Sequence, residues 1–463
     1  MDMNSDKPRE ECGIFGIYDP HGNGDIAANV YFGLMALQHR GQESCGIAVN
    51  NDRDITYRKG LGLVNEVFNP SFFEELKGDM AIGHVRYSTH GDGRAENAQP
   101  LVLNYIKGIF AVAHNGNILN YDELKEEYSQ SGSIFQTTID SEIIAYTIAK
   151  ERVHSRSVEE AVSFAMKKLK GAYSLVVMSP QKVIAARDPW GFRPLCVGKT
   201  KNGAYVFASE SCALDAVDAT LVRDVLPGEV VMIKRGKDEL ISDTTNCNKY
   251  KSTMCIFEYI YFARPDSIIG GQFVQEARRR AGGYLAKQAP VPADIVIGVP
   301  DSGISAAKGY STESGIPLEE GFVKNRYIAR TFIRPTQASR ESAVRVKLNP
   351  LRERIAGKRV VMVDDSIVRG TTCKRIVNLL KKAGAAEVHV RICAPPFLNP
   401  CYFGTDIPSE KELIAHQYTL DETRRYINAD SLEYLSLENL PKIAPDAKTD
   451  FCTACFSNDY PVS

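Results

Sequence analysis

The first half of the chain is built from short apolar runs separated by turns. Within residues 12–231, runs such as CGIFGIYD, MAIGHVRYS, IFAVAHNGN and YSLVVMS have the length and residue types of strands. In residues 140–152 and 157–169, apolar residues recur at helical intervals instead. A sheet layered with helices accommodates both patterns, so this half is predicted to be an α+β domain.

The second half has a different rhythm, which starts after about Tyr250. The apolar run ADIVIGV leads through PDSG into the helical pattern ISAAKGYSTESG, and RVVMV leads through DDSIVRGTT into CKRIVNLLKKAG. This alternation of strand, loop and helix predicts an α/β domain with a central parallel sheet, in which ligands collect at the carboxyl ends of the strands. From about Pro395 onward the pattern is irregular, and this last segment contains the cysteine-bearing CTAC.

The composition is that of an ordinary globular protein of two or three domains, with 463 residues, 44% hydrophobic and 24% charged. A formal net charge of -1 gives no overall electrostatic case for nucleic acid or a membrane as partner. Because no run of about 18 apolar residues occurs and the first eleven residues are polar, a cytoplasmic protein is predicted. Its eleven cysteines, an odd number, suit thiolate chemistry or metal binding better than a disulfide framework.

Cys12 is the first candidate for chemistry. It opens CGIFGIYD after the polar leader MDMNSDKPREE. If this leader is a propeptide that is removed after Glu11, Cys12 gains a free α-amino group. With a reference pKa of about 8, this amine can act as the base for its own thiol, whose reference pKa is about 8.5. The alternative is a buried cysteine at the start of a strand.

Two later segments carry groups that suit an amide substrate. HVRYST contains Arg86, which can hold a carboxylate, and HNGN contains Asn115 and Gly116. Amide hydrolysis through a thioester needs donors aimed at the developing oxyanion, and an Asn side chain with a Gly backbone N–H can supply them. Taken separately, each segment could be an ordinary turn.

Together these segments resemble the N-terminal-nucleophile (Ntn) glutamine amidotransferases. CGIFG, LQHRGQES, IGHVRYST, HNGNI and IDSE occur in that family's order over about residues 12–235. The resemblance implies an Ntn hydrolase sandwich and a role for each motif. By it, Cys12 is the nucleophile, Asn115 and Gly116 form the oxyanion hole, Arg86 holds the glutamine α-carboxylate, Asp140 pairs with the α-ammonium, and Arg40 orders the substrate site.

The string VVMVDDSIVRGTT, residues 360–372, is the clearest motif of the second half. Its apolar run predicts a buried parallel strand with Asp364 and Asp365 at the carboxyl end. The loop that follows offers backbone N–H groups, hydroxyls and a helix N-terminus to a phosphate. The two carboxylates can meet ribose hydroxyls directly or through Mg²⁺. An Asp-Asp pair before a helix can also be a simple cap.

The whole string resembles the phosphoribosyl pyrophosphate signature of the type I phosphoribosyltransferases, and GVPDSG resembles their pyrophosphate loop. The resemblance implies a magnesium site on Ser302, Asp364 and Asp365. It also implies a larger set of substrate-binding residues, which are Asp301, Ser302, Gly303, Lys347, Asp364, Asp365, Arg369, Gly370, Thr371 and Thr372.

Residues 324–347 are strongly basic, with seven basic residues and one acidic residue, Glu341. Scattered charge of this kind can simply mark a solvated loop. However, departure of pyrophosphate leaves an oxocarbenium-like centre that water would capture. We therefore predict a basic lid that neutralises the leaving group and excludes water.

Both resemblances, in this order, match the glutamine phosphoribosylpyrophosphate amidotransferase family over nearly the whole chain. The implied reaction converts phosphoribosyl pyrophosphate, glutamine and water to 5-phosphoribosylamine, glutamate and pyrophosphate, the first step of purine synthesis. The implied organisation is a propeptide (1–11), an amidotransferase domain (12–235), a phosphoribosyltransferase domain (250–395) and a cluster-binding segment (396–463), in a homotetramer inhibited by purine nucleotides.

Two other functions compete with this interpretation. A ligand-sensing regulator could keep the phosphoribosyl fold, but it would have no use for a glutaminase site. An amidotransferase with another acceptor, such as a sugar phosphate, would leave the 360–372 loop unexplained.

The cysteines of CTAC have the spacing of metal, cluster or redox sites. Two further cysteines, in MCIFEYIYF and NPCYFG, resemble ligand positions in the cluster-containing branch of the family, which also has a cleaved leader. The resemblance implies a structural [4Fe-4S] cluster on Cys255, Cys401, Cys452 and Cys455. Cys247 and Cys393 are close alternatives, and a zinc ion could use the same four thiolates. Apolar filling is expected for Cys45, Cys196, Cys212 and Cys373.

Overall fold

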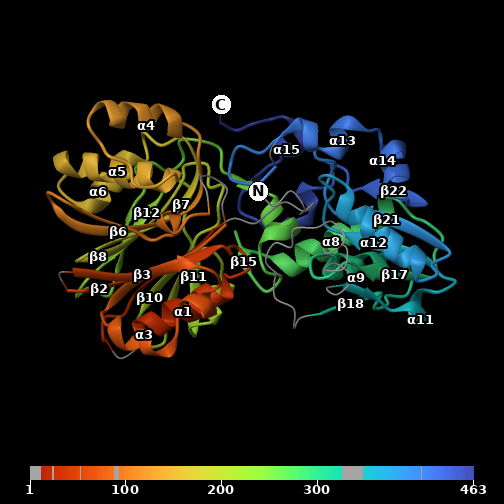
Figure 1. The fold of residues 1–463 in the computed structure, drawn as a ribbon, viewed down its shortest axis with the longest axis horizontal. Helices are drawn as coiled ribbons and strands as arrows, with labels where there is room; N and C mark the ends of the chain where they lie inside the picture. Colours follow the sequence, from red (N-terminus) through yellow and green to blue (C-terminus); the bar gives the residue numbers. More distant parts are fainter. Residues whose placement is uncertain are drawn as a thin grey trace.

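The computed structural model describes residues 12–22, 25–52, 54–87, 93–325, 348–407 and 409–462. Figure 1 shows two halves side by side, with the N-terminal half (red to green) on the left and the C-terminal half (green to blue) on the right.

Two antiparallel sheets form the centre of the N-terminal half. The seven-stranded sheet has the order β11-β9-β10-β1-β4-β2-β3, and the six-stranded sheet has the order β13-β12-β8-β7-β6-β5. Apolar side chains from alternate positions, such as Ile82 and Ala113, fill the space between the sheets. The strands are β1 (Gly13–Tyr18), β2 (Ser44–Asn51), β3 (Asp54–Leu61), β4 (Met80–Arg86), β5 (Leu101–Tyr105), β6 (Gly108–Ile118), β7 (Gly171–Ser179), β8 (Lys182–Arg187), β9 (Cys196–Thr200), β10 (Tyr205–Ala208), β11 (Ala219–Asp224), β12 (Val230–Lys234) and β13 (Leu240–Asp243).

Helices cover the outer face of each sheet, so this half has four layers. In Figure 1, α4, α5 and α6 lie above the six-stranded sheet, and α1 and α3 lie below the seven-stranded one. The helices predicted over 140–152 and 157–169 are present as α5 and α6, although α6 ends earlier, at Ala165. The helices are α1 (Ile26–Ala36), α2 (Val64–Val67), α3 (Pro70–Glu75), α4 (Tyr121–Gln130), α5 (Asp140–His154), α6 (Val158–Ala165) and α7 (Cys212–Asp215).

The C-terminal half contains a four-stranded parallel sheet of order β17-β20-β21-β22. Its strands are apolar on both faces because helices cover both. The helices α8 and α9 pack on one face, and α12 and α14 lie over the other. The bounds are β17 (Ile295–Gly298), β20 (Arg359–Asp364), β21 (Glu387–Ile392), β22 (Ser431–Tyr434), α8 (Val274–Gln288), α9 (Gly303–Ser314), α12 (Thr371–Lys382) and α14 (Leu420–Tyr426).

Shorter elements connect this sheet to the rest of the chain. They are the π-helix η2 (Glu258–Phe262), the strands β15 (Ile268–Ile269), β16 (Gln272–Phe273), β18 (Phe322–Lys324) and β19 (Leu348–Pro350), and the helices α11 (Arg352–Ile355) and α13 (Ile414–Gln417).

The end of the chain returns to the start of the C-terminal half. There β23 (Asp450–Cys452) pairs in parallel with β14 (Thr253–Cys255), and α15 (Ala454–Ser457) follows. A loop of the N-terminal half completes this junction, because Phe192 O accepts a hydrogen bond from Cys255 N at 3.2 Å. The junction therefore holds both halves together.

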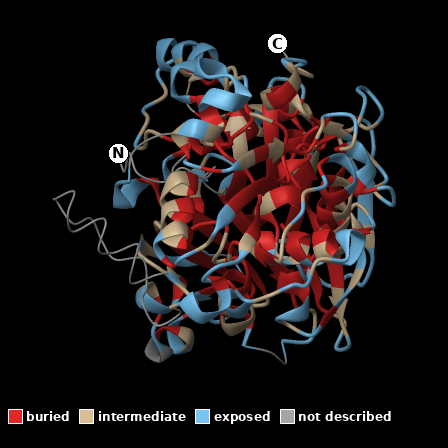
Figure 2. Ribbon diagram, turned by 90° about the vertical axis from the view of Figure 1, so that its right-hand side faces the viewer, coloured by how far each residue is buried: buried red, intermediate tan, exposed pale blue. Residues whose placement is uncertain are grey.

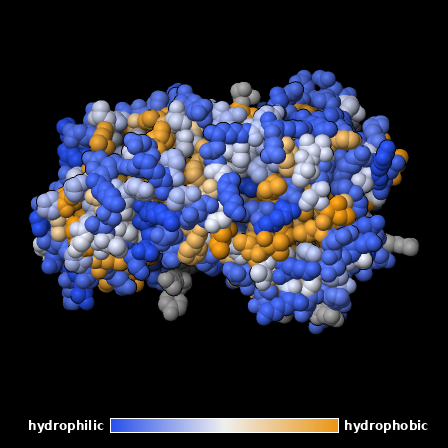
Figure 3. Space-filling model, turned by 180° about the vertical axis from the view of Figure 1, so that it is seen from behind, coloured by the Kyte–Doolittle hydropathy of each residue, from blue (hydrophilic) through white to orange (hydrophobic). Residues whose placement is uncertain are grey.

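The distribution of buried and exposed residues agrees with this layered architecture. Figure 2 looks onto the C-terminal half and shows buried residues concentrated in the sheet and the inner faces of the helices, with exposed residues around them. The face in Figure 3 is mostly hydrophilic, with a hydrophobic strip across its lower middle.

Within the described part of the chain, no helix is both long and apolar enough to span a bilayer. The predicted α+β and α/β classes are confirmed.

Candidate active sites and the cysteine cavity

Cys12 lies directly before β1, at the end of the sandwich. Its side chain is buried, and the thiol donates a hydrogen bond to Tyr87 O at 3.6 Å. Burial raises the pKa of this thiol to about 11; Asp140 and Glu43 also raise it, and Arg86 lowers it. At neutral pH the thiol is therefore protonated while the leader remains attached.

In the part of the chain that the structure describes, the Cys12 thiol has no hydrogen bond to a side chain. Among the described residues, the contact with Tyr87 O is its one hydrogen bond, so no histidine or carboxylate there is placed to accept its proton. The α-amine of Cys12 stays the predicted base.

Asn115 and Gly116 lie on β6, in the facing sheet. The Asn115 side chain is fully buried, and within the described structure neither its oxygen nor its nitrogen has a hydrogen-bond partner. An unpaired buried amide is costly, which favours a role in binding a ligand. Gly116 has φ +144°, and a Cβ there would lie 2.0 Å from Ala172 O, so the position requires glycine.

Arg86 and Asp140 carry opposite charges close to the nucleophile. Arg86 ends β4 and is buried. Asp140 is the first residue of α5, where its carboxylate accepts a hydrogen bond from Ile118 N at 3.0 Å and lies 3.6 Å from His114 Nδ1. Both side chains influence the Cys12 thiol electrostatically, so the structure brings these three motif residues together. A cation and an anion suit the two ends of an amino acid.

Arg40 is fully buried in an ion-pair network. Its guanidinium donates to Glu210 at 2.6 Å and to Glu258 at 2.7 Å, and its Nε donates to Cys12 O at 3.3 Å. Burial alone would lower the pKa of Arg40, but Glu258 and Glu210 outweigh it and raise that pKa. With its charge engaged by protein carboxylates, Arg40 is placed to position the backbone of Cys12.

The carboxylates of this network, Glu210 and Glu258, are not among the residues predicted from the sequence. Glu258 belongs to the C-terminal half and also lies 3.6 Å from Arg193, while Glu210 accepts hydrogen bonds from His39 and Ser267. A single acidic residue within the otherwise apolar FEYIYF was the available signal for Glu258.

The carboxyl ends of β17 and β20 bring together the two predicted phosphoribosyl motifs. Asp364 ends β20, and both it and Asp365 are buried. Ser302, in the loop after β17, hydrogen-bonds through its hydroxyl to the Asp365 carboxylate, which also accepts from Ser366 at 2.6 Å. A Cβ on Gly303 would lie 2.5 Å from Val363 O, so the two loops pack backbone against backbone.

The loop after Asp365 opens α12 as predicted. Gly370 is the N-cap with φ +80°, a conformation that favours glycine, and Thr371 and Thr372 form the first turn. The Arg369 guanidinium pairs with Glu412 at 2.5 Å. The groups predicted to bind phosphate therefore lie at the same sheet edge as the two carboxylates.

Asp301 is exposed and forms an ion pair with Lys324, the first residue of the predicted lid. Lys347 and most of that lid, like the leader at 1–11, lie outside the described residues.

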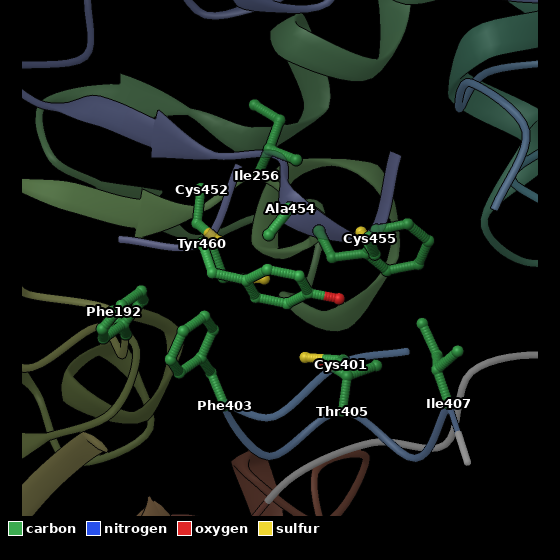
Figure 4. A pocket seen from close by; sticks show the side chains of 12 residues that line it. Phe192, Ile256, Cys401, Phe403, Thr405, Ile407, Cys452, Ala454, Cys455 and Tyr460 are labelled. Carbon is green, nitrogen blue, oxygen red and sulfur yellow. The ribbon is translucent and has the colours of Figure 1, made fainter. Parts of the chain in front are cut away.

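Four cysteines line a cavity at the junction of the two halves. They are Cys255, Cys401, Cys452 and Cys455, and the other lining residues are mainly aromatic and aliphatic. Figure 4 shows Cys452 and Cys455 on one side of the cavity and Cys401 on the other, beside Phe403 and Tyr460. The alternatives Cys247 and Cys393 do not line it.

The electrostatics of this cavity disfavour bare thiolates. Burial, together with the neighbouring thiols, raises the pKa values of Cys255 and Cys452 to about 12, although Arg193 lowers both in part. Within the described ranges, no three His, Cys, Asp or Glu side chains converge closely enough to hold a single metal ion.

Family models match both halves of the chain. A model described as a glutamine amidotransferase domain matches residues 84–216, and one described as a phosphoribosyl transferase domain matches residues 269–396. Fold and sites together define a class of enzyme in which a glutaminase and a phosphoribosyltransferase share one chain.

Similarity to individual proteins extends over the full length. The chain is 50% identical over 455 residues to an amidophosphoribosyltransferase of Archaeoglobus fulgidus, covering 98% of each. A solved structure of the allosteric regulatory enzyme of purine biosynthesis matches with a TM-score of 0.91 and 46% identity, over 98% of this chain and 96% of that one. The glutamine phosphoribosylpyrophosphate amidotransferase of B. subtilis, complexed with ADP and GMP, matches with a TM-score of 0.90 and 46% identity, over 98% of each chain.

The chain belongs to the amidophosphoribosyltransferase family. The predicted fold, an Ntn sandwich followed by a type I phosphoribosyltransferase domain, is confirmed, as is the prediction of an enzyme that carries out glutamine-dependent amidophosphoribosyl transfer. The roles of individual residues remain predictions.

Proposed function

We propose that Cys12 releases ammonia from glutamine and that the 360–372 loop holds the phosphoribosyl pyrophosphate that receives it. The observation that carries this proposal is the buried Cys12 thiol, which both Arg86 and Asp140 influence electrostatically, in the same chain as the carboxylates at the end of β20. Neither a regulator nor an amidotransferase with another acceptor needs both sites.

The glutaminase reaction follows from the groups around Cys12. Once residues 1–11 are removed, the α-amine takes the thiol proton and the thiolate attacks the glutamine carboxamide carbon. Asn115 Nδ2 and the Gly116 N–H donate to the oxyanion. The C–N bond then breaks as the amine returns the proton to the departing ammonia, and water hydrolyses the thioester to glutamate. Arg86 and Asp140 hold the α-carboxylate and α-ammonium groups.

The second reaction occurs at the carboxyl end of the parallel sheet. Ammonia attacks the anomeric carbon, and the bond from that carbon to the pyrophosphate oxygen breaks. The 301–303 loop binds the leaving pyrophosphate, and the 369–372 loop binds the 5-phosphate through backbone N–H groups and hydroxyls. Because ammonia in neutral water is mostly protonated and not nucleophilic, we propose that it passes between the sites inside the protein.

Magnesium fits the chemistry of this edge. The oxygens of Ser302, Asp364 and Asp365 are hard donors of the kind Mg²⁺ prefers, and Ser302 and Asp365 are already within hydrogen-bond distance of each other. A bound Mg²⁺ would neutralise charge on the pyrophosphate.

Simultaneous measurement of glutamate and pyrophosphate tests the function. With both substrates present, we expect the two products in a 1:1 ratio, because one ammonia displaces one pyrophosphate. A regulator would release neither product. An amidotransferase with another acceptor would release glutamate without pyrophosphate, which would overturn the proposal.

We also propose that Cys255, Cys401, Cys452 and Cys455 hold a [4Fe-4S] cluster with a structural role. The support is that these four cysteines line one cavity and that they come from the two ends of the C-terminal half. When bound, such a cluster would crosslink these distant segments and make metal binding part of the folding free energy.

The cluster proposal predicts the behaviour of Cys452→Ser. We expect this variant to be colourless, to contain little iron and to unfold at a lower temperature than the parent, because one of four ligands is lost. Cys247→Ser is the matched control and should keep its iron. Iron-free parent protein with unchanged activity and heat stability would contradict the cluster, and stoichiometric zinc would favour the other metal.

We also propose that the chain is organised as a propeptide (1–11), an amidotransferase domain (12–235), a phosphoribosyltransferase domain (250–395) and a cluster-binding segment (396–463). We propose that the protein is a cytoplasmic homotetramer and that purine nucleotides inhibit it. The hydrophobic strip in Figure 3 supports contact between subunits. The solved B. subtilis relative that holds ADP and GMP supports nucleotide binding.

A further inference from the structure

The oxyanion residues lie on a part of β6 that its neighbouring strand does not cover. β6 pairs with β7 from Ala111 to Ile118, but β5 pairs with β6 only as far as Leu101 opposite Val112. Asn115 and Gly116 therefore lie beyond the end of β5. If the register continued, residue 99 would stand opposite residue 114.

Two buried side chains replace the missing strand at His114, the residue before Asn115. His114 N donates to the Gln99 side-chain carbonyl at 2.9 Å, and His114 O accepts a hydrogen bond from His84 Nε2, also at 2.9 Å. Gln99 is the residue that the continued register would place there. Both side chains are almost fully buried, so water does not compete for these bonds.

We infer that His84 and Gln99 are positioning residues for the oxyanion hole: their side chains clamp the backbone of His114 and so fix the strand that carries Asn115 and Gly116. This inference rests on the proposed role of those two residues. Oxyanion stabilisation depends on donors held within a few tenths of an ångström of the developing charge, because reorganisation during the reaction would weaken it. An uncovered strand end needs such a clamp.

The protonation state of His84 suits this task. Since a carbonyl only accepts, Nε2 must carry the proton, and Nδ1 is then the bare nitrogen, buried without a partner among the described residues. Burial lowers the pKa of His84 to about 3, and it outweighs the hydrogen bond to His114 O, which raises that pKa; the charge of Arg86 lowers it as well. His84 therefore stays neutral, with its donor in place, over the whole working pH range.

His84→Phe tests the clamp in the full-length, processed enzyme. We expect kcat with glutamine to fall roughly 10–100-fold, a part of what loss of an oxyanion donor costs, with KM for glutamine within about threefold. Ammonia-dependent synthesis should be unchanged. The γ-aldehyde analogue of glutamine forms a thiohemiacetal with Cys12, whose oxygen occupies the hole, so its affinity should fall by a similar factor. His84→Gln, which keeps a donor, should recover most of both losses.

The outcomes separate the clamp from its alternatives. Unchanged kcat and aldehyde affinity in His84→Phe, alongside losses in Asn115→Ala, would overturn the clamp while leaving the oxyanion hole intact. Unchanged values in Asn115→Ala would overturn both assignments. Equal loss of glutamine- and ammonia-dependent synthesis in His84→Phe would show a merely structural role. If His84→Phe does not fold, comparison of Gln99→Leu with Gln99→Glu tests the bond to His114 N instead. Gln99→Leu removes the acceptor of that bond, and Gln99→Glu keeps an acceptor.

Discussion

Replacing Cys12 with serine is expected to abolish glutamine-dependent synthesis of phosphoribosylamine, by about a thousandfold or more, while ammonia-dependent synthesis stays within about twofold. A hydroxyl is far harder to deprotonate than a thiol, and Cys12 has no side-chain base among the described residues. The phosphoribosyl site lies in the other half and keeps its residues. Parallel assays with glutamine and with ammonium at elevated pH measure the two activities.

Cys45→Ser is the matched control for this prediction. Cys45 is also buried, but it lies within β2 of the seven-stranded sheet and belongs to the core beneath α1. Its replacement should lower the unfolding temperature without a selective loss of glutamine-dependent activity. If Cys12→Ser reduced both activities equally, the division of the reaction between two sites would be wrong.

The leader gives a second way to test the nucleophile. An enzyme that still carries residues 1–11 should show the same selective loss as Cys12→Ser, because an amide nitrogen cannot accept the thiol proton and burial raises the pKa of that thiol to about 11. Mass spectrometry reports whether the leader is present. Full glutaminase activity in the unprocessed protein would refute the role of the α-amine.

Replacing Asp365 with asparagine is expected to remove synthesis with either nitrogen source, by at least about a hundredfold. The carboxylate is buried at the sheet edge, where it accepts hydrogen bonds from Ser302 and Ser366. An amide places a donor towards those hydroxyls and removes the charge that would bind Mg²⁺. Glutamine- and ammonia-dependent assays, with magnesium titrated, measure the effect.

Asp294→Asn is the matched control at the opposite edge of the same strands. Asp294 precedes β17 and pairs with Arg359, the first residue of β20, at 2.9 Å. The same chemical change there should leave both activities nearly unchanged, since the ion pair is partly exposed and lies away from the ligand-binding edge. Retained ammonia-dependent turnover in Asp365→Asn would show that the acidic pair only caps α12.

Local sequence patterns were sufficient to predict both fold classes and the ends of the strands that carry chemistry. A strand or helix shows itself in the periodicity of its own residues, and an apolar run such as VVMV necessarily places the next residues, Asp364 and Asp365, at its carboxyl end. The resemblance to a family then indicated Cys12 as the candidate nucleophile, and it indicated four cysteines that line one cavity in the structure.

Only the tertiary structure decided which groups support these motif residues. Glu258 pairs with Arg40 from 218 positions away, and His84 reaches His114 O across the two sheets. The register of β5 against β6, which leaves the proposed oxyanion residues Asn115 and Gly116 uncovered, depends on where one strand ends relative to another. The packing of distant elements determines which group pairs with a buried charge or a carbonyl at an uncovered strand end. Local sequence periodicity therefore does not predict that partner.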